Sequence, residues 1–319
     1  MPRSPRRSLL LAGLLTLAPA APLAGQDTAG VASATSGARE PYPVRCGVTH
    51  VGHSPGYEPI PSGDVFCPLV ADPKGLRSFV SYLRADSNFV ARDVASVGVA
   101  DQFGLFRVNG ARQGDGVQVS LAGSVFAQFD LGASSYDLIN ADYIVGLPVT
   151  LRRGGFSARL RIYHQSSHLG DELLLRGEAD ERIERENLSF ESVEGILSQD
   201  VGPLRVYGGG EWLFNREPER LGRSIAHYGA ELRPSAAVRF GGAARARLVA
   251  AVDLKSVAEQ DWRTAVSARA GIEVGRPREG AERGRRWSLL AEFYDGPSPY
   301  GQFYARAVRF TGLGFHFVL

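Results

Sequence analysis

The sequence predicts an all-β fold, an antiparallel transmembrane β-barrel of about 12 strands, and three observations support it. The chain begins with an export signal, and its later segments alternate apolar and polar residues over ten or more positions. After the signal, no apolar run approaches the ~18 residues that a membrane-spanning helix needs. Alternating segments of about ten residues in an exported chain are typical of strands that face lipid on one side and a polar lumen on the other. A soluble β-sandwich is the alternative, because its strands alternate as well.

The export signal occupies residues 1–25. Arg3, Arg6 and Arg7 precede an apolar run, and small residues follow from Ala20 to Gly25, which is the pattern of a secretory signal peptide. Gln26 stands where a lipoprotein would carry its lipidated cysteine. We therefore expect cleavage near this point and no lipid anchor.

Residues 26–75 lack sustained periodicity and are rich in Gly, Pro, Ser and Asp. We interpret them as a short irregular N-terminal periplasmic segment that leads into the barrel. The two cysteines of the chain, Cys46 and Cys67, both lie here. Because the protein is exported to an oxidising compartment, a disulfide between them is expected.

The barrel is predicted to span residues 76–319. An even number of strands is usual for bacterial barrels. The twelve predicted strands begin near residues 76, 94, 116, 138, 156, 187, 204, 224, 245, 263, 286 and 305. The last segment, RFTGLGFHFVL, places Leu313, Phe315, Phe317 and Leu319 on one face. This resembles the terminal strands that the barrel-assembly machinery recognises during biogenesis, although Leu319 replaces the usual aromatic residue.

Charged residues are predicted to fill the lumen. In the segment from Ala246 to Leu254, every second residue is apolar, and Arg247, Asp253 and Lys255 lie on the opposite face. We expect a charge-paired interior rather than a wide pore. The charged residues assigned to it are Arg159, Arg161, Arg205, Glu211, Asp253, Lys255, Arg269, Glu273 and Glu292.

The stretch YHQSSHLGDE, residues 163–172, ends one of these strands with two histidines and two serines. Side chains two positions apart share a face of a strand, so His164, Ser166 and His168 follow Ile162 toward lipid. Eight residues at ~3.3 Å each, tilted by ~40°, place His164 roughly 20 Å above Phe156 in an apolar band of ~25 Å. The pair would therefore lie at the level of the outer-leaflet headgroups.

Two interpretations of His164 and Ser166 remain open. The strand can simply become polar at the membrane interface, or Ser166 can be a nucleophile with His164 as its general base. Residues i and i+2 lie about 6.5–7 Å apart along one face of a strand. Over this distance an imidazole can tilt toward a serine hydroxyl and form a hydrogen bond with it. His164 and His168 do not form a metal pair, because four strand residues separate them by roughly 13 Å.

The sequence HQS resembles the His-x-Ser motif of outer-membrane phospholipase A, a twelve-stranded barrel whose catalytic histidine and serine face lipid, and lipid A deacylases are similar in this motif. The resemblance implies Ser166 as nucleophile, His164 as base and Asn187 as the residue that orients the imidazole. Lipid A deacylases have an acidic residue in that third role, which implies Glu178 as the alternative. Ser167 and His168 depart from the Asn-Gly of the phospholipase.

The same resemblance implies a calcium ion and a homodimer, since phospholipase-like barrels use Ca2+ at a dimer interface. Ser167, Asp171 and Glu172 offer the oxygen ligands for such an ion. The alternative for Gly170, Asp171 and Glu172 is a solvated turn that opens an extracellular loop.

A similarity over most of the mature chain is to a bacterial outer-membrane β-barrel family of unknown function, through the SSHLGDE block and the later segment RENLSFE. It implies no established activity. The sequence thus predicts an outer-membrane barrel in contact with membrane lipids, either a phospholipase A-like or lipid A deacylase-like acyl hydrolase or a noncatalytic narrow channel or structural component. The net charge of +2 and the absence of a phosphate-binding glycine loop speak against nucleic-acid and nucleotide binding.

Overall fold

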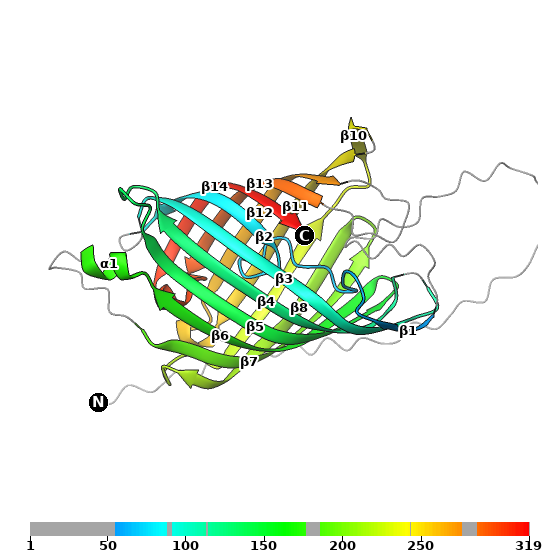
Figure 1. The fold of residues 1–319 in the computed structure, drawn as a ribbon, viewed down its shortest axis with the longest axis horizontal. Helices are drawn as coiled ribbons and strands as arrows, with labels where there is room; N and C mark the ends of the chain where they lie inside the picture. Colours follow the sequence, from blue (N-terminus) through cyan, green and yellow to red (C-terminus); the bar gives the residue numbers. More distant parts are fainter. Residues whose placement is uncertain are drawn as a thin grey trace, which may run out of the picture. The chain divides into compact units, whose positions relative to one another are not determined.

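The computed structural model describes residues 55–87, 91–112, 114–176, 186–242, 244–275 and 286–318. Twelve of its strands pair side by side, each antiparallel to the next, into one closed barrel (Figure 1). These strands are β2 (Ser78–Asp86), β3 (Asp93–Asn109), β4 (Gly116–Asp130), β5 (Leu138–Arg153), β6 (Phe156–Leu169), β7 (Leu188–Val201), β8 (Leu204–Glu217), β9 (Ser224–Leu232), β11 (Ala244–Val257), β12 (Thr264–Gly275), β13 (Arg286–Pro297) and β14 (Ala307–Val318). The prediction of a twelve-stranded antiparallel barrel is confirmed.

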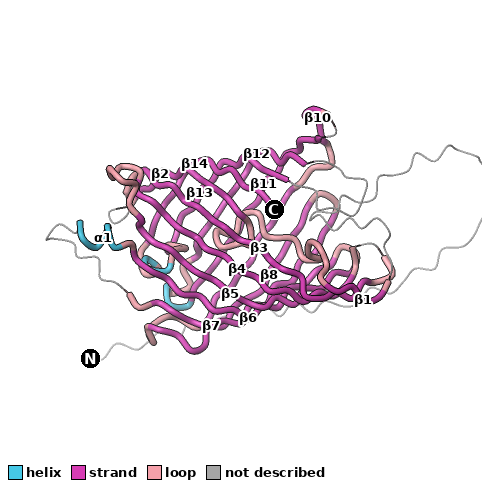
Figure 2. The backbone as a smooth tube through the Cα atoms, in the orientation of Figure 1, coloured by secondary structure: helices cyan, strands magenta, loops and turns pink. Residues whose placement is uncertain are grey.

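Closure joins the last strand to the first. β14 pairs with β2 from Arg309 opposite Asp86 to Phe317 opposite Ser78, so the wall has no free edge. Two short strands extend it at one end, where β1 (Gly56–Pro59) pairs with β3 and β10 (Ala237–Gly241) pairs with β11. Figure 2 shows that strands make up nearly all of the wall, with loops confined largely to its two ends.

The outer face of the wall is apolar and the inner face is polar. On β6, Leu160 and Ile162 are exposed, whereas Arg159 and Arg161, which alternate with them, are buried. Leu248 and Leu313 on other strands are likewise more than half exposed. A closed barrel with an apolar outer surface satisfies its backbone polar groups internally and presents hydrocarbon-compatible side chains to lipid. The protein is therefore a barrel of the bacterial outer membrane. Among the described residues, no helix has the length and apolarity needed to cross a bilayer.

The two ends of the barrel differ in their connections. One end carries two-residue turns at Gly154–Gly155 and at 202–203. The first residue of each turn is a glycine with positive φ, 60° at Gly154 and 55° at Gly202. The opposite end carries the long segments 170–187 and 298–306, which include helix α1 (Asp171–Arg176) and the short 3-10 helix η2 (Gly301–Phe303). In Figure 1, α1 lies at the end opposite to β1 and β10. Because outer-membrane barrels have short periplasmic turns and longer extracellular loops, α1 lies on the extracellular side.

Ion pairs fill the middle of the lumen, as predicted. Glu194 on β7 accepts hydrogen bonds from Arg159 and Arg161 on β6, each at 2.9 Å. The same arrangement recurs around the barrel, where Glu231 pairs with Arg233 at 2.6 Å and Arg269 pairs with Glu292 at 3.4 Å. Buried charges of this kind are tolerated because each has a partner of opposite sign.

The segment before β2 lies inside the barrel, which the sequence did not indicate. Residues from Val65 to Asp72 are irregular and, except for half-buried Pro68, buried, and wall residues hydrogen-bond to their backbone. Arg205 donates to the Cys67 carbonyl at 3.0 Å, and Arg269 donates to the Val70 carbonyl at 2.8 Å. The predicted irregular conformation is therefore observed, but the described part forms a plug in the lumen rather than a lead-in below it.

Side chains of this plug also contact the wall. Asp72 pairs with Lys255 on β11 at 2.8 Å. The centre of the Phe66 ring lies 4.9 Å from the guanidinium carbon of Arg159 and 4.7 Å from that of Arg205, which are cation–π contacts. Cys67 is buried within the plug. Cys46 lies outside the described residues, so the disulfide between the two cysteines stays a prediction.

Glu194→Gln is expected to destabilise the barrel. The neutral amide cannot balance two buried guanidinium groups, so we expect the free energy of unfolding to fall by on the order of 3 kcal/mol. The midpoint of guanidinium-induced unfolding in detergent, followed by tryptophan fluorescence, measures this change. Glu217→Gln, at an exposed carboxylate on β8, is the matched control. Equal midpoints for the two variants would show that the Glu194 ion pairs contribute little.

Candidate active site on the outer wall

His164 and Ser166 lie on the outer face of β6. The strand alternates as the sequence predicts, so Tyr163, Gln165 and Ser167 point into the barrel and are buried. His164 and Ser166 are partly exposed, and His168 is exposed. They occupy the extracellular end of the strand, directly before the segment that leads to α1. The histidine and the serine therefore share one face of one strand, and their position at the headgroup level stays a prediction.

Glu191 on β7 is the partner of His164. The two residues stand directly opposite each other in the β6–β7 register, and His164 Nδ1 lies 2.9 Å from Glu191 Oε1. Both side chains remain accessible, at 42% and 31%. A carboxylate on Nδ1 fixes the ring orientation and stabilises the imidazolium that forms when Nε2 accepts a proton. This is the arrangement that a general-base histidine requires.

A β-bulge on β8 adds a fourth polar residue to this row. The β7–β8 register shifts between Ser189 and Glu191, and Asn215 has a φ of 47°. Bulges re-aim side chains next to functional sites. Here Phe214 and Asn215 are both exposed, although they are consecutive, and Asn215 Nδ2 donates to Glu191 Oε2 at 2.6 Å. Glu191 is therefore held from both sides, by the imidazole on β6 and the amide on β8.

Ser166 is open on the same face. Its neighbours across the strands are Tyr143 on β5 and Ser189 on β7. Within the described ranges, neither the Ser166 hydroxyl nor His164 Nε2 has a hydrogen-bond partner in the protein. Both groups therefore remain available to each other and to a substrate.

The structure does not bring Asn187, the predicted third residue of the triad, next to His164. Asn187 is exposed just before β7, and its neighbour Leu188 stands opposite Ser167. It is four residues away from Glu191, or about 13 Å along an extended chain. Glu191, not Asn187, therefore lies beside the His164 ring. The other candidate, Glu178, lies outside the described residues.

The predicted calcium ligands do not form one site. Ser167 faces the lumen, where its hydroxyl donates to Asn140 Oδ1 at 3.1 Å and to Asp142. Asp171 and Glu172 are exposed in the first turn of α1, beyond the end of β6. Because the barrel wall separates Ser167 from the face that carries Ser166, this serine cannot join an ion beside the candidate nucleophile. The structure therefore does not bring these three residues together, and calcium binding stays a prediction.

His168 packs against an aromatic side chain. Its ring lies edge-on to that of Tyr143, with centroids 5.6 Å apart. No metal-ligand cluster of the described residues includes His168. Its contact with Tyr143 is a packing interaction on the outer face above Ser166.

Comparison with solved structures shows several barrels of similar length. Outer membrane phospholipase A from Escherichia coli is 14% identical, with a TM-score of 0.48 over 77% of this chain and 93% of that chain. The Salmonella typhi outer membrane phospholipase, a dimer with bound calcium, is 13% identical, with a TM-score of 0.45 over 76% and 90%. The translocator domain of the autotransporter NalP from Neisseria meningitidis is 12% identical, with a TM-score of 0.30 over 79% and 91%.

Sequence comparison gives the family. No curated protein matches the chain. A family model described as "Protein of unknown function (DUF1207)" matches residues 49–319, which include every strand of the barrel. The chain therefore belongs to the DUF1207 family of proteins of unknown function.

Proposed function

We propose that this barrel is a serine acyl hydrolase of outer-leaflet lipids, with Ser166 as nucleophile, His164 as general base and Glu191 as the residue that orients the imidazole. The observation that carries the proposal is the row from His164 through Glu191 to Asn215, at 2.9 and 2.6 Å on the lipid-facing wall. Its acidic third member is what the resemblance to lipid A deacylases implies. The site lies within one chain, so the predicted homodimer is not needed to assemble it and stays a prediction.

The proposed reaction proceeds through an acyl-enzyme. Ser166 Oγ attacks the ester carbonyl carbon of a lipid while His164 Nε2 takes the hydroxyl proton. The imidazolium, stabilised by Glu191, then donates that proton to the leaving alcohol as the ester bond breaks. A water molecule from the headgroup region then attacks the acyl-enzyme carbonyl while His164 Nε2 takes its proton. The bond to Ser166 breaks as that proton passes to Ser166 Oγ, and the fatty acid is released. The position of the site at the interface gives access to both the ester and water.

A noncatalytic channel is the competing function, and the plug inside the lumen is evidence against it. The plug of residues 65–72 is buried inside the barrel and anchored to several strands. A channel would need a continuous path past these contacts. It would also give no role to a carboxylate, an imidazole and an amide joined on the outer wall.

Fatty-acid release by the refolded barrel tests the proposal. The protein is mixed with detergent-dispersed phospholipid and, separately, with lipid A, and free fatty acid is quantified by mass spectrometry. We expect release from at least one of them. Folded barrel that releases no fatty acid from either lipid would overturn the hydrolase.

Calcium is not a part of the proposed mechanism, because Ser167 lies on the other side of the wall from Ser166. We therefore expect the rate of fatty-acid release to be the same in millimolar Ca2+ and in excess EDTA. The double variant Asp171→Asn with Glu172→Gln should retain the wild-type rate under both conditions. Loss of activity in EDTA that calcium restores would contradict this expectation.

A further inference from the structure

Three buried arginines lie close together in the periplasmic half of the lumen. Arg77 precedes β2, Arg205 lies at the start of β8, and Arg233 follows β9, so all three belong to the end of the wall that carries the short turns. They are 6%, 0% and 7% exposed. Guanidinium groups stay charged when they are buried, so each of them needs a negative charge nearby.

Glu231 on β9 is shared by two of these arginines. Its Oε2 lies 2.6 Å from Arg233 Nη1 and 3.6 Å from Arg205 Nη1. Its Oε1 accepts a hydrogen bond from the Val70 amide at 2.8 Å, and Arg205 donates to the Cys67 carbonyl at 3.0 Å. The backbone of the plug therefore borders this group of charges.

Glu273 on β12 is shared as well. Its Oε1 lies 3.5 Å from Arg247 Nε and 3.7 Å from Arg286 Nη1. Arg77 and Arg233 interact with it electrostatically from farther away. At these distances Oε1 accepts no hydrogen bond. Glu273 thus supplies one negative charge to four arginines and binds none of them closely.

Arg77 has no carboxylate of its own. Within the described residues its side chain makes no ion pair or hydrogen bond, and its Nε is buried without an acceptor. Glu273 and Glu231 attract it electrostatically, but Arg233 and Arg269 repel it. Arg233 Nε is also buried without an acceptor. Buried donors of this kind are costly unless an acceptor binds them.

Positive charge therefore exceeds negative charge by at least two in this group of described residues. The arginines counted are Arg77, Arg205, Arg233 and Arg247, and the carboxylates are Glu231 and Glu273. Two neighbouring ion pairs do not change the balance, because Arg152 pairs with Asp200 at 3.1 Å and Arg269 with Glu292 at 3.4 Å.

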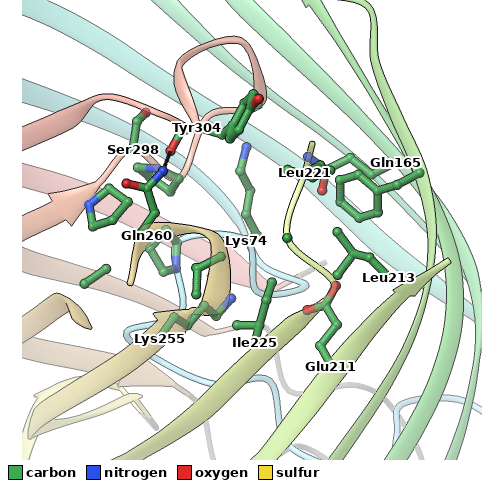
Figure 3. Close-up of a pocket in the computed structure, with 18 of the residues that line it drawn as sticks. Lys74, Gln165, Glu211, Leu213, Leu221, Ile225, Lys255, Gln260, Ser298 and Tyr304 are labelled. Atoms are coloured by element: carbon green, nitrogen blue, oxygen red, sulfur yellow. Dashed lines mark hydrogen bonds between the residues drawn. The ribbon is translucent and has the colours of Figure 1, made fainter. Parts of the chain in front are cut away.

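The other side of the plug has no such surplus among the described residues. Figure 3 shows Lys74, Lys255 and Glu211 around the cavity there. The cations of that part are Lys74, Arg159, Arg161 and Lys255, and the carboxylates are Asp72, Asp142, Glu194, Glu211 and Asp253. Only the periplasmic half of the lumen thus has positive charge for an anion to balance.

From this arrangement we propose that the periplasmic half of the lumen binds a small doubly charged oxyanion of the phosphate or sulfate type. The oxyanion accepts hydrogen bonds from Arg77 and Arg233, and its charge offsets the surplus. Guanidinium groups match the oxygens of such anions in geometry and charge. The side chain of Arg247 is 26% exposed, so solvent reaches the group. The site lies inside the barrel and does not depend on the proposed hydrolase.

The test compares anions of different charge. Sodium sulfate, sodium phosphate and sodium chloride are titrated by isothermal calorimetry into the full chain, folded in dodecyl maltoside at constant ionic strength, so that screening is the same throughout. We expect sulfate and phosphate to bind at one site, about tenfold or more tightly than chloride, because the dianions accept several charge-assisted hydrogen bonds.

Variants locate the site. Arg77→Gln should weaken sulfate binding by about tenfold or more, whereas Arg239→Gln, at an exposed arginine on β10, should keep the wild-type affinity. Glu273→Gln should bind sulfate more tightly than wild type, because it removes a competing negative charge, and it tests the site even if Arg77→Gln fails to fold. The proposal is overturned if folded wild type binds neither dianion, if chloride binds as tightly, or if folded Arg77→Gln or Glu273→Gln binds sulfate as wild type does.

Discussion

Ser166→Ala is expected to lower the rate of fatty-acid release by about 10³-fold or more. The proposed mechanism requires the Ser166 oxygen to form the acyl-enzyme, and removal of a triad nucleophile leaves only the residual catalysis that substrate binding provides. The side chain is small, partly exposed and without a protein partner in the described structure. Its replacement should therefore leave the fold and stability of the barrel intact.

Ser189→Ala is the matched control for this change. Ser189 stands directly opposite Ser166 on β7, at the same height and on the same face. Kinetics of wild type and both variants on one lipid dispersion should show a loss only for Ser166→Ala. Equal activity of the two variants would remove Ser166 from the mechanism.

Glu191→Ala is expected to lower the same rate by about 10²-fold to 10⁴-fold. Without the carboxylate, the His164 ring loses both its fixed orientation and the charge that stabilises its protonated form. The effect should fall on the maximal rate, because Glu191 touches the imidazole rather than the substrate. Asn215→Ala should cause a smaller loss, since Glu191 then keeps its contact with His164.

Asn187→Ala serves as the comparison for Glu191→Ala. Asn187 was the third residue that the phospholipase resemblance implied, and the structure places it beyond the reach of His164. Steady-state kinetics should show wild-type activity for this variant. A large loss in Asn187→Ala together with an active Glu191→Ala variant would restore the sequence-based triad and overturn the one proposed here.

The strand positions were predictable from the sequence because alternation is a local property. Each predicted strand of the wall begins within two residues of its observed start. The facing of His164 and Ser166 was predictable for the same reason, since it depends only on parity within β6. Both results rest on residues close together in the chain.

The role of Glu191 was not predictable, because it depends on register between strands. The link from β6 to β7 is long, and the strand that follows has glutamates at both parities, Glu191 and Glu194. A shift of one residue exchanges the two faces of a strand. The structure settles the choice through pairing, with Glu191 opposite His164 outside and Glu194 beside Arg159 inside. The bulge at Asn215 also changes the register between two strands, so the local sequence pattern could not predict it.

The plug and the apolar side chains at the extracellular end of the lumen were missed for a related reason. Residues 65–72 have no periodicity, and their partners, such as Arg205, Arg269 and Lys255, lie more than a hundred residues away in the sequence. The inward face was expected to be polar throughout. Near the extracellular end, however, it carries Phe190 and Leu213, which belong to one buried apolar cluster with Tyr300 and Phe303 from the segment between β13 and β14.

Covalent labelling with hexadecanesulfonyl fluoride is the measurement that tests the central claim most directly. An activated serine displaces fluoride from this lipid-like probe, and peptide mass spectrometry then locates the adduct. We predict one adduct, on Ser166, in folded wild type, and none in His164→Ala. A folded barrel that stays unlabelled, or that is labelled equally on Ser166 and Ser189, would contradict an activated nucleophile on this wall.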